Sequence, residues 1–231
     1  MRARRMIMPK DADVLAWAFP CEDARVEFMY GGHTTYFTRI AVDALADELS
    51  TKSAVQQVAV GTSPKYRKLM NLHYKWLSSY FICLIFSTFA LESYINGYGV
   101  RKCTAKYFTE YLEKLSIEAK WIVIPRLATG ISIYGSKGHV LLKKLIKVRN
   151  RLAHDKPKYL KTFDREDVET ALIYYGGIRD ISKEVSALDA VQTMIELDTK
   201  LQEIDEANVF RLADPYLRRR WTELDGSNSP P

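Results

Sequence analysis

Arg149 and His154 are the residues of this sequence whose types and spacing best suit chemistry. On a helix that turns about 100° per residue, Arg149 shares a sector with the apolar residues Leu141, Leu142, Leu145, Ile146, Val148 and Leu152. A guanidinium there needs a carboxylate, an interface or a ligand phosphate, because an unpaired buried charge is strongly destabilising. His154, with an ordinary pKa of about 6.5, can transfer protons near neutral pH. Asn150 lies one helical turn before His154, so the three side chains suit phosphate binding and proton transfer.

The same residues also fit a structural role. In that interpretation Arg149 pairs with a carboxylate inside the protein, and His154 complements the C-terminal end of its helix, where a cation is favoured. The candidate carboxylate is Glu92, the only charged residue between Trp76 and Val100. We therefore predict an ion pair between Glu92 and Arg149, with Asn96 one turn further along and able to bond to the same group.

The segment around Arg149 is strongly basic. Between Lys137 and Lys161 the only acidic residue is Asp155. This distribution gives a local positive field that suits a phosphate backbone, although a solvated lysine face is a compatible alternative. The residues that we expect to contact RNA are Lys147, Arg151, Lys156 and Lys158.

The run Arg149-Asn150-Arg151-Leu152-Ala153-His154 resembles the arginine-to-histidine motif of the HEPN superfamily. Phe89–Asn96 looks like an equivalent helix of that family, and Glu118–Leu127 looks like its connecting segment. The resemblance covers roughly residues 64–206 and implies a small helical bundle. Many members are metal-independent endoribonucleases of toxin-antitoxin, abortive-infection or CRISPR-linked systems, and others are catalytically silent.

The resemblance implies a metal-independent endoribonuclease of a toxin-antitoxin or anti-phage defence system, with no cofactor. Arg149 would hold the scissile phosphate, and His154 would take the 2′-hydroxyl proton or give one to the leaving 5′-oxygen. Asn150 would orient His154 or a phosphate oxygen. The products would be a 2′,3′-cyclic phosphate and a 5′-hydroxyl.

Partners follow from the same resemblance. One motif offers a single histidine, so we expect the family's symmetric homodimer with a composite active site. An antitoxin or a defence complex is a further expected partner. In one branch a tyrosine stands two residues after the histidine and is the point of control by a nucleotidyltransferase partner; Lys156 stands there in this chain, so that control is not implied.

Two other function classes remain open. One is a non-catalytic HEPN module, a dimerising adaptor that binds RNA or a nucleotide in a defence complex. The other is a purely structural helical regulator of such a complex. Nucleoside triphosphate hydrolysis is not supported, because the glycine-containing loop Gly130–Gly138 matches neither a P-loop nor a dinucleotide fingerprint.

Composition indicates a globular protein in a reducing cytoplasm. Apolar residues make up 47% of the 231, and the three cysteines have neither disulfide nor zinc-ligand spacing. The apolar run Trp76–Ile95 is about as long as a membrane span, but its serines, Thr88 and Glu92 favour the central helix of a bundle. The basic start of the chain is followed by Pro9 rather than an apolar core, so we predict no signal peptide and no membrane partner.

The predicted fold is mainly α: a HEPN-like bundle of four to five helices with a small N-terminal α+β extension. Residues 1–62 would form the extension, residues 63–206 the bundle and residues 207–231 a flexible tail. In the extension, Arg25–Tyr30 and His33–Ile40 would form a hairpin around Gly31-Gly32, followed by a helix over Val42–Leu49. The bundle helices are expected over 64–96, 104–118, 141–154 and 164–206, the last with a bend at Gly176-Gly177.

Overall fold

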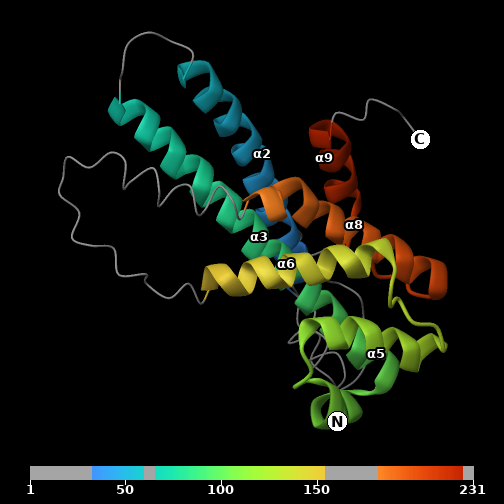
Figure 1. Cartoon of the computed structure of the whole chain (residues 1–231). Helices are drawn as coiled ribbons and strands as arrows, with labels where there is room; N and C mark the ends of the chain where they lie inside the picture. Colours follow the sequence, from blue (N-terminus) through green and yellow to red (C-terminus); the bar gives the residue numbers. More distant parts are fainter. Residues whose placement is uncertain (1–32, 60–65, 154–181, 226–231) are drawn as a thin grey trace, which may run out of the picture.

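The structure is an all-helical bundle over the residues that it describes (Figure 1). It is a computed structural model, and it describes residues 33–59, 66–153 and 182–225. The helices are α2 (Thr34–Ala59), α3 (Tyr66–Cys103), α4 (Ala105–Tyr107), the π-helical segment η2 (Phe108–Leu112), α5 (Ile117–Thr129), α6 (Lys137–Ala153), α8 (Ala187–Ile204) and α9 (Pro215–Asp225). The mainly α fold is confirmed, and no strand occurs within these ranges.

The predicted N-terminal hairpin is wrong in the half that can be seen. Residues Thr34–Ile40, expected as its second strand, form the first turns of α2, while the first strand, 25–30, lies outside the described residues. The reason is the spacing of the residues that face the core: the buried Ala41 and Leu45 follow the partly buried Phe37 at intervals of four, which is the helical repeat rather than the strand repeat. The helix expected over Val42–Leu49 exists as part of α2.

Helices α2 and α3 lie side by side and run in opposite directions (Figure 1). The ring of Phe37 contacts those of Phe86 and Phe89, with centroids 5.8 and 5.6 Å away, and Thr34 Oγ1 donates to Ser93 Oγ over 3.1 Å. Fully buried residues of α2 belong to the same hydrophobic core as the later helices. The described part of residues 1–62 is therefore integral to the bundle and is not a separate extension.

Helix α3 is the longest element and continues past its predicted end at Asn96. It passes through Gly97 and Gly99 to Cys103. A Cβ on Gly99 would lie 2.8 Å from the ring of Phe108, so this glycine permits close packing of η2 and does not stop the helix. The stretch Asn71–Cys103 is long and apolar enough to cross a membrane, but 56% of its most apolar window is buried by the other helices. That burial is consistent with the core helix of a soluble protein.

The single helix expected over 104–118 is divided into shorter pieces. Thr104 adopts a positive φ of 65°, which separates α3 from α4, and its side chain accepts the Tyr107 N–H. Ser116 accepts the Ala119 N–H and caps α5. Pro125 is buried inside α5, which continues to Thr129.

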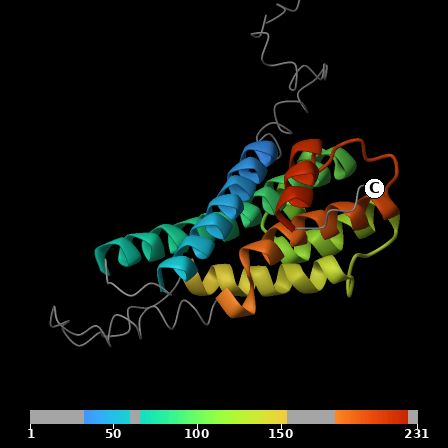
Figure 2. The ribbon, with the colours of Figure 1, turned by 90° about the horizontal axis from the view of Figure 1, so that it is seen from above.

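Helix α8 lies against most of the other helices. Ser186 and Asp189 form a capping box, in which each side chain accepts the other residue's backbone N–H. The Tyr80 hydroxyl donates to the Val185 carbonyl over 2.8 Å, which ties α3 to the start of α8. Figure 2 shows α6 and α8 lying alongside each other. The C-terminal part of the helix expected over 164–206 is thus confirmed, and residues 164–181 lie outside the described ranges.

The predicted flexible tail is wrong for residues 207–225. Leu217 of α9 is fully buried against the bundle. The carboxylate of Asp198 in α8, itself fully buried, accepts the Leu212 N–H and an Arg218 N–H, both over 2.8 Å. These bonds fix the chain between α8 and α9. The segment looked like a polar tail in the sequence because its few buried residues are separated by charged ones.

Candidate nucleic-acid interface

Helix α6 carries the predicted site, and its position is set by its apolar face. Leu142, Leu145 and Val148 are buried, as their helical spacing predicted. Gly138 lies against Leu197, and a Cβ there would come within 3.0 Å of that side chain. The small residue therefore lets the first turn of α6 approach α8 closely, which leaves the opposite face of α6 to solvent.

Arg149 is partly buried, and its guanidinium has no carboxylate partner among the described residues. Its Nε is buried without a hydrogen-bond partner in that part of the chain. Such a donor is costly unless a group from outside satisfies it. The predicted ion pair with Glu92 is not formed.

Glu92 instead pairs with Lys120 of α5, whose Nζ lies 3.9 Å from Glu92 Oε1. Lys120 is buried, and burial lowers its pKa, an effect that the negative charges of Glu92 and Glu113 partly oppose. Lys120 carries the same sequence signal as Arg149, since Ile117, Lys120 and Ile124 share the buried face of α5. The sequence therefore contained two candidate cations for Glu92, Arg149 and Lys120, and the one on α5 is its partner in the structure.

Asn96 lies one turn after Glu92 on α3, as predicted. Its Oδ1 is buried and has no hydrogen-bond partner among the described residues. Helices α3 and α6 contact each other, so the structure leaves one unpaired acceptor and one unpaired donor on neighbouring helices.

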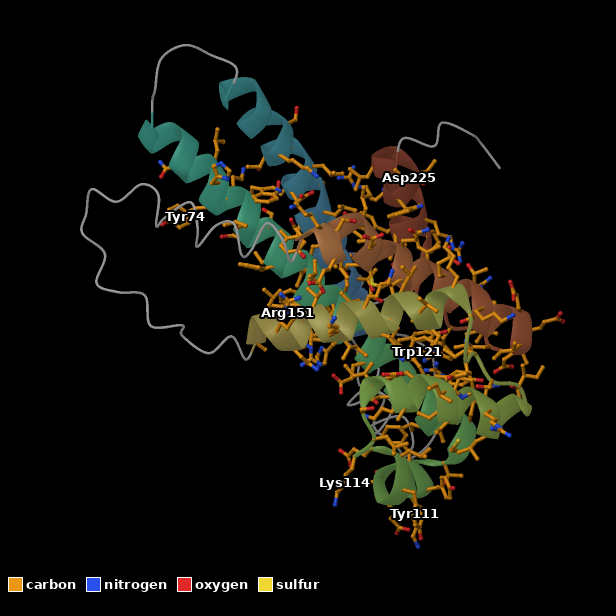
Figure 3. The ribbon with its side chains drawn as sticks, viewed as in Figure 1. Tyr74, Tyr111, Lys114, Trp121, Arg151 and Asp225 are labelled. Carbon is orange, nitrogen blue, oxygen red and sulfur yellow. The ribbon has the colours of Figure 1, made fainter. Side chains whose placement is uncertain are left out.

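The solvent face of α6 is cationic. Lys143, Lys144, Lys147 and Arg151 are exposed there, as is Asn150. Figure 3 shows Arg151 close to the C-terminal end of the helix. Three predicted site residues, His154, Lys156 and Lys158, lie outside the described residues, so their roles stay predictions.

Carboxylates partly neutralise this face. Glu184, just before α8, hydrogen-bonds to Arg151 Nη1 and lies 3.8 Å from Lys147 Nζ. Glu118 of α5 lies 4.0 Å from Lys143 Nζ. Lys144 has no ion pair with the described residues, and so remains available to a ligand.

The sequence interpretation missed His139, at the start of α6. Its side chain is buried; Nδ1 accepts the Gly135 N–H over 3.2 Å, and Nε2 lies 3.3 Å from Glu118 Oε1. These contacts place the ring proton on Nε2, facing the carboxylate. With both nitrogens occupied, His139 fastens the loop before α6 to α5. Its position one turn before Leu142 on the apolar face was the available signal.

No group of histidine, cysteine and acidic side chains in the described ranges has the arrangement of a metal site. Comparisons with protein-family models, with curated proteins and with solved structures find no match to this chain. The functional assignment therefore depends on the geometry of α6 and on the chemistry of its residues.

Proposed function

We propose that this protein binds RNA along the exposed face of α6 and cleaves it without a metal ion, as a HEPN-type endoribonuclease. The observation that carries the proposal is Arg149, whose guanidinium has no carboxylate partner in the described ranges, on a helix with a cationic solvent face. A phosphate supplies the oxygen atoms that a guanidinium binds best, and neighbouring lysines would attract the rest of the backbone.

RNA carries its own nucleophile, so the proposed reaction needs few groups. The 2′-oxygen attacks the adjacent phosphorus as the bond to the 5′-oxygen breaks, which leaves a 2′,3′-cyclic phosphate and a 5′-hydroxyl. Arg149 holds the phosphate and stabilises the charge that develops on it. His154 takes the 2′-hydroxyl proton or protonates the departing 5′-oxygen, and Asn150 orients the imidazole or a phosphate oxygen.

Two proton transfers are required, whereas one copy of the motif contributes a single histidine. The proposal therefore includes a homodimer in which two motifs share one cleft. It also places the protein in the cytoplasm, as part of a toxin-antitoxin or anti-phage defence system with an antitoxin or defence-complex partner. The HEPN assignment rests on the motif and on the helical fold.

The test is cleavage of mixed RNA by the purified protein in EDTA. We expect wild-type protein and His33→Ala, which changes an exposed histidine outside α6, to give fragments that end in 2′,3′-cyclic phosphates, detected by mass spectrometry. His154→Ala should lose this activity while it keeps the wild-type circular dichroism spectrum. Equal cleavage by His154→Ala would assign the activity to another site or to a contaminant and would refute the proposal.

A non-catalytic RNA-binding adaptor is the second candidate. One observation favours it. His139 is the histidine of α6 that the structure describes, and both of its ring nitrogens are engaged in contacts within the protein, so this imidazole is not placed to transfer protons to RNA. An adaptor would bind RNA with the same affinity in the wild type and in His154→Ala and would leave it intact. Binding without cleavage under the conditions above would select this function.

A further inference from the structure

Two cations of α6 converge on one carboxylate. Lys147 and Arg151 are four residues apart and so lie on the same face of the helix. One oxygen of Glu184 accepts a hydrogen bond from Arg151 Nη1, and the other lies 3.8 Å from Lys147 Nζ. The two side chains therefore already share one position for a negative group.

That position is open to solvent. The side chains of Lys147, Arg151 and Glu184 are 72%, 44% and 41% exposed, so an incoming anion reaches them without any opening of the core. Exposed ion pairs contribute little to folding, because water and salt screen the attraction between the charges. A phosphate carries oxygens in a similar spacing to a carboxylate and binds the guanidinium in the same way.

The carboxylate is held in its charged form. The hydrogen bond from Arg151 lowers the pKa of Glu184, and the charges of Arg151 and Lys147 act in the same direction. Glu184 therefore competes with any other anion for the two cations at neutral pH. The neighbouring carboxylate Glu118 differs, because it is also held by the buried His139.

We propose that Lys147 and Arg151 form a single phosphate subsite for RNA and that Glu184 occupies this subsite until RNA displaces it. The inference rests on the proposed RNA-binding function and goes beyond it, because it names the position of one phosphate and an internal competitor for it. Glu184 thus sets the affinity of the surface and limits binding of weaker or shorter anions.

The experiment uses the full chain and a fluorescent 2′-O-methyl oligoribonucleotide, which lacks the nucleophile and so reports binding alone. Glu184→Gln should tighten binding about two- to five-fold at low salt, the effect of one surface ion pair. The matched control is Glu203→Gln, which removes the same charge from a surface pair with Lys200 at 2.8 Å. This control should change affinity by less than the Glu184 variant.

A double variant separates the local effect from net charge. In an Arg151→Gln background, Glu184→Gln should give a much smaller gain, because one of the two cations is already absent. All variants should keep the wild-type circular dichroism spectrum, as expected for exposed positions. The inference is overturned if Glu184→Gln binds like wild type, if Glu203→Gln gives an equal gain, or if the gain persists without Arg151.

The outcomes also separate this inference from the proposed function. Wild-type binding with no effect of Glu184→Gln refutes the subsite and leaves RNA binding intact. Absence of binding by every variant refutes the proposed function and the subsite together. A gain in binding with no cleavage of ordinary RNA supports the subsite and selects the adaptor.

Discussion

Removal of the buried carboxylate of Asp198 should detach the C-terminal helix from the bundle. In Asp198→Ala the Leu212 N–H loses its acceptor in a position where Leu212 is 1% exposed, and Arg218 loses its anion. Asp198→Asn is the matched variant, because an amide oxygen can still accept the Leu212 N–H. The pair of variants separates the backbone bond from the charge.

The expected magnitude follows from these contacts. An unsatisfied buried N–H costs about 1–3 kcal/mol, and a hydrogen bond to a charged group contributes about 1.5–3 kcal/mol. Two features reduce the sum: burial of the carboxylate raises its pKa and so opposes its charged form, and Arg218 is 45% exposed and regains water. We expect a loss of about 2–4 kcal/mol for Asp198→Ala and about half of that for Asp198→Asn.

Thermal unfolding followed by circular dichroism provides the measurement. For a chain of this size each kcal/mol lowers Tm by about 2–4 °C, so Asp198→Ala should melt about 5–15 °C below wild type. Arg211→Gln, which removes a half-exposed cation 3.8 Å from the same carboxylate, should shift Tm by much less. A Tm for Asp198→Ala within about 1 °C of wild type would refute the packing of residues 207–225 against α8.

Three further predictions concern the interior. Gly99→Ala should destabilise the protein by about 1–3 kcal/mol in urea unfolding, because its Cβ would meet the Phe108 ring at 2.8 Å; an unchanged midpoint would contradict this close packing. The pKa of Lys120 lies below its ordinary 10.5, so the unfolded chain binds more protons between the two values and stability should rise with pH through that window. Lys120→Met should remove this rise and add on the order of 1 kcal/mol at neutral pH, and a rise of equal size in the variant would assign it to another group. Arg149→Met should abolish RNA cleavage while stability in urea stays equal or increases, since its buried Nε has no partner among the described residues; a large loss of stability would make Arg149 a structural residue instead.

Helical periodicity in the sequence was sufficient to predict the central helices. The buried faces of α6 and α8 follow the expected spacing, and the apolar run that begins at Trp76 is the core of α3. In these segments local pattern and tertiary packing agree. The prediction that Arg149 lies on the apolar face of α6 agrees with the structure, in which Arg149 is partly buried.

The errors have specific physical causes. Gly31-Gly32 and the aromatic residues that follow suggested a hairpin, but Phe37 packs on two phenylalanines of α3, a contact that local pattern cannot reveal. The helix predicted to end at Asn96, just before Gly97 and Gly99, continues to Cys103, because Gly99 packs against Phe108 of the next segment and does not stop the helix. These are tertiary effects that override local preference.

The sequence predicted which residues belong to the candidate site, but it did not predict which of them form ion pairs with one another. The sequence identified Arg149, Glu92 and the basic run, but the choice between Arg149 and Lys120 as the partner of Glu92 depends on how α5 packs against α3. The contact between Glu184 and Arg151 could not be predicted, because 32 residues separate them in the sequence and no local periodicity relates their positions. The contact exists because α8 returns alongside α6.

The central position of α8 has a consequence for synthesis on the ribosome. Helices α2 and α3 are synthesised before α8, which begins at Ala187 and covers part of their apolar faces. At ordinary elongation rates the interval between the synthesis of α3 and that of α8 is on the order of ten seconds. During that interval the nascent α2–α3 pair exposes apolar surface that α8 later covers, and exposed apolar surface favours aggregation. A chain that ends before α8 should therefore aggregate, whereas the full chain covers this surface.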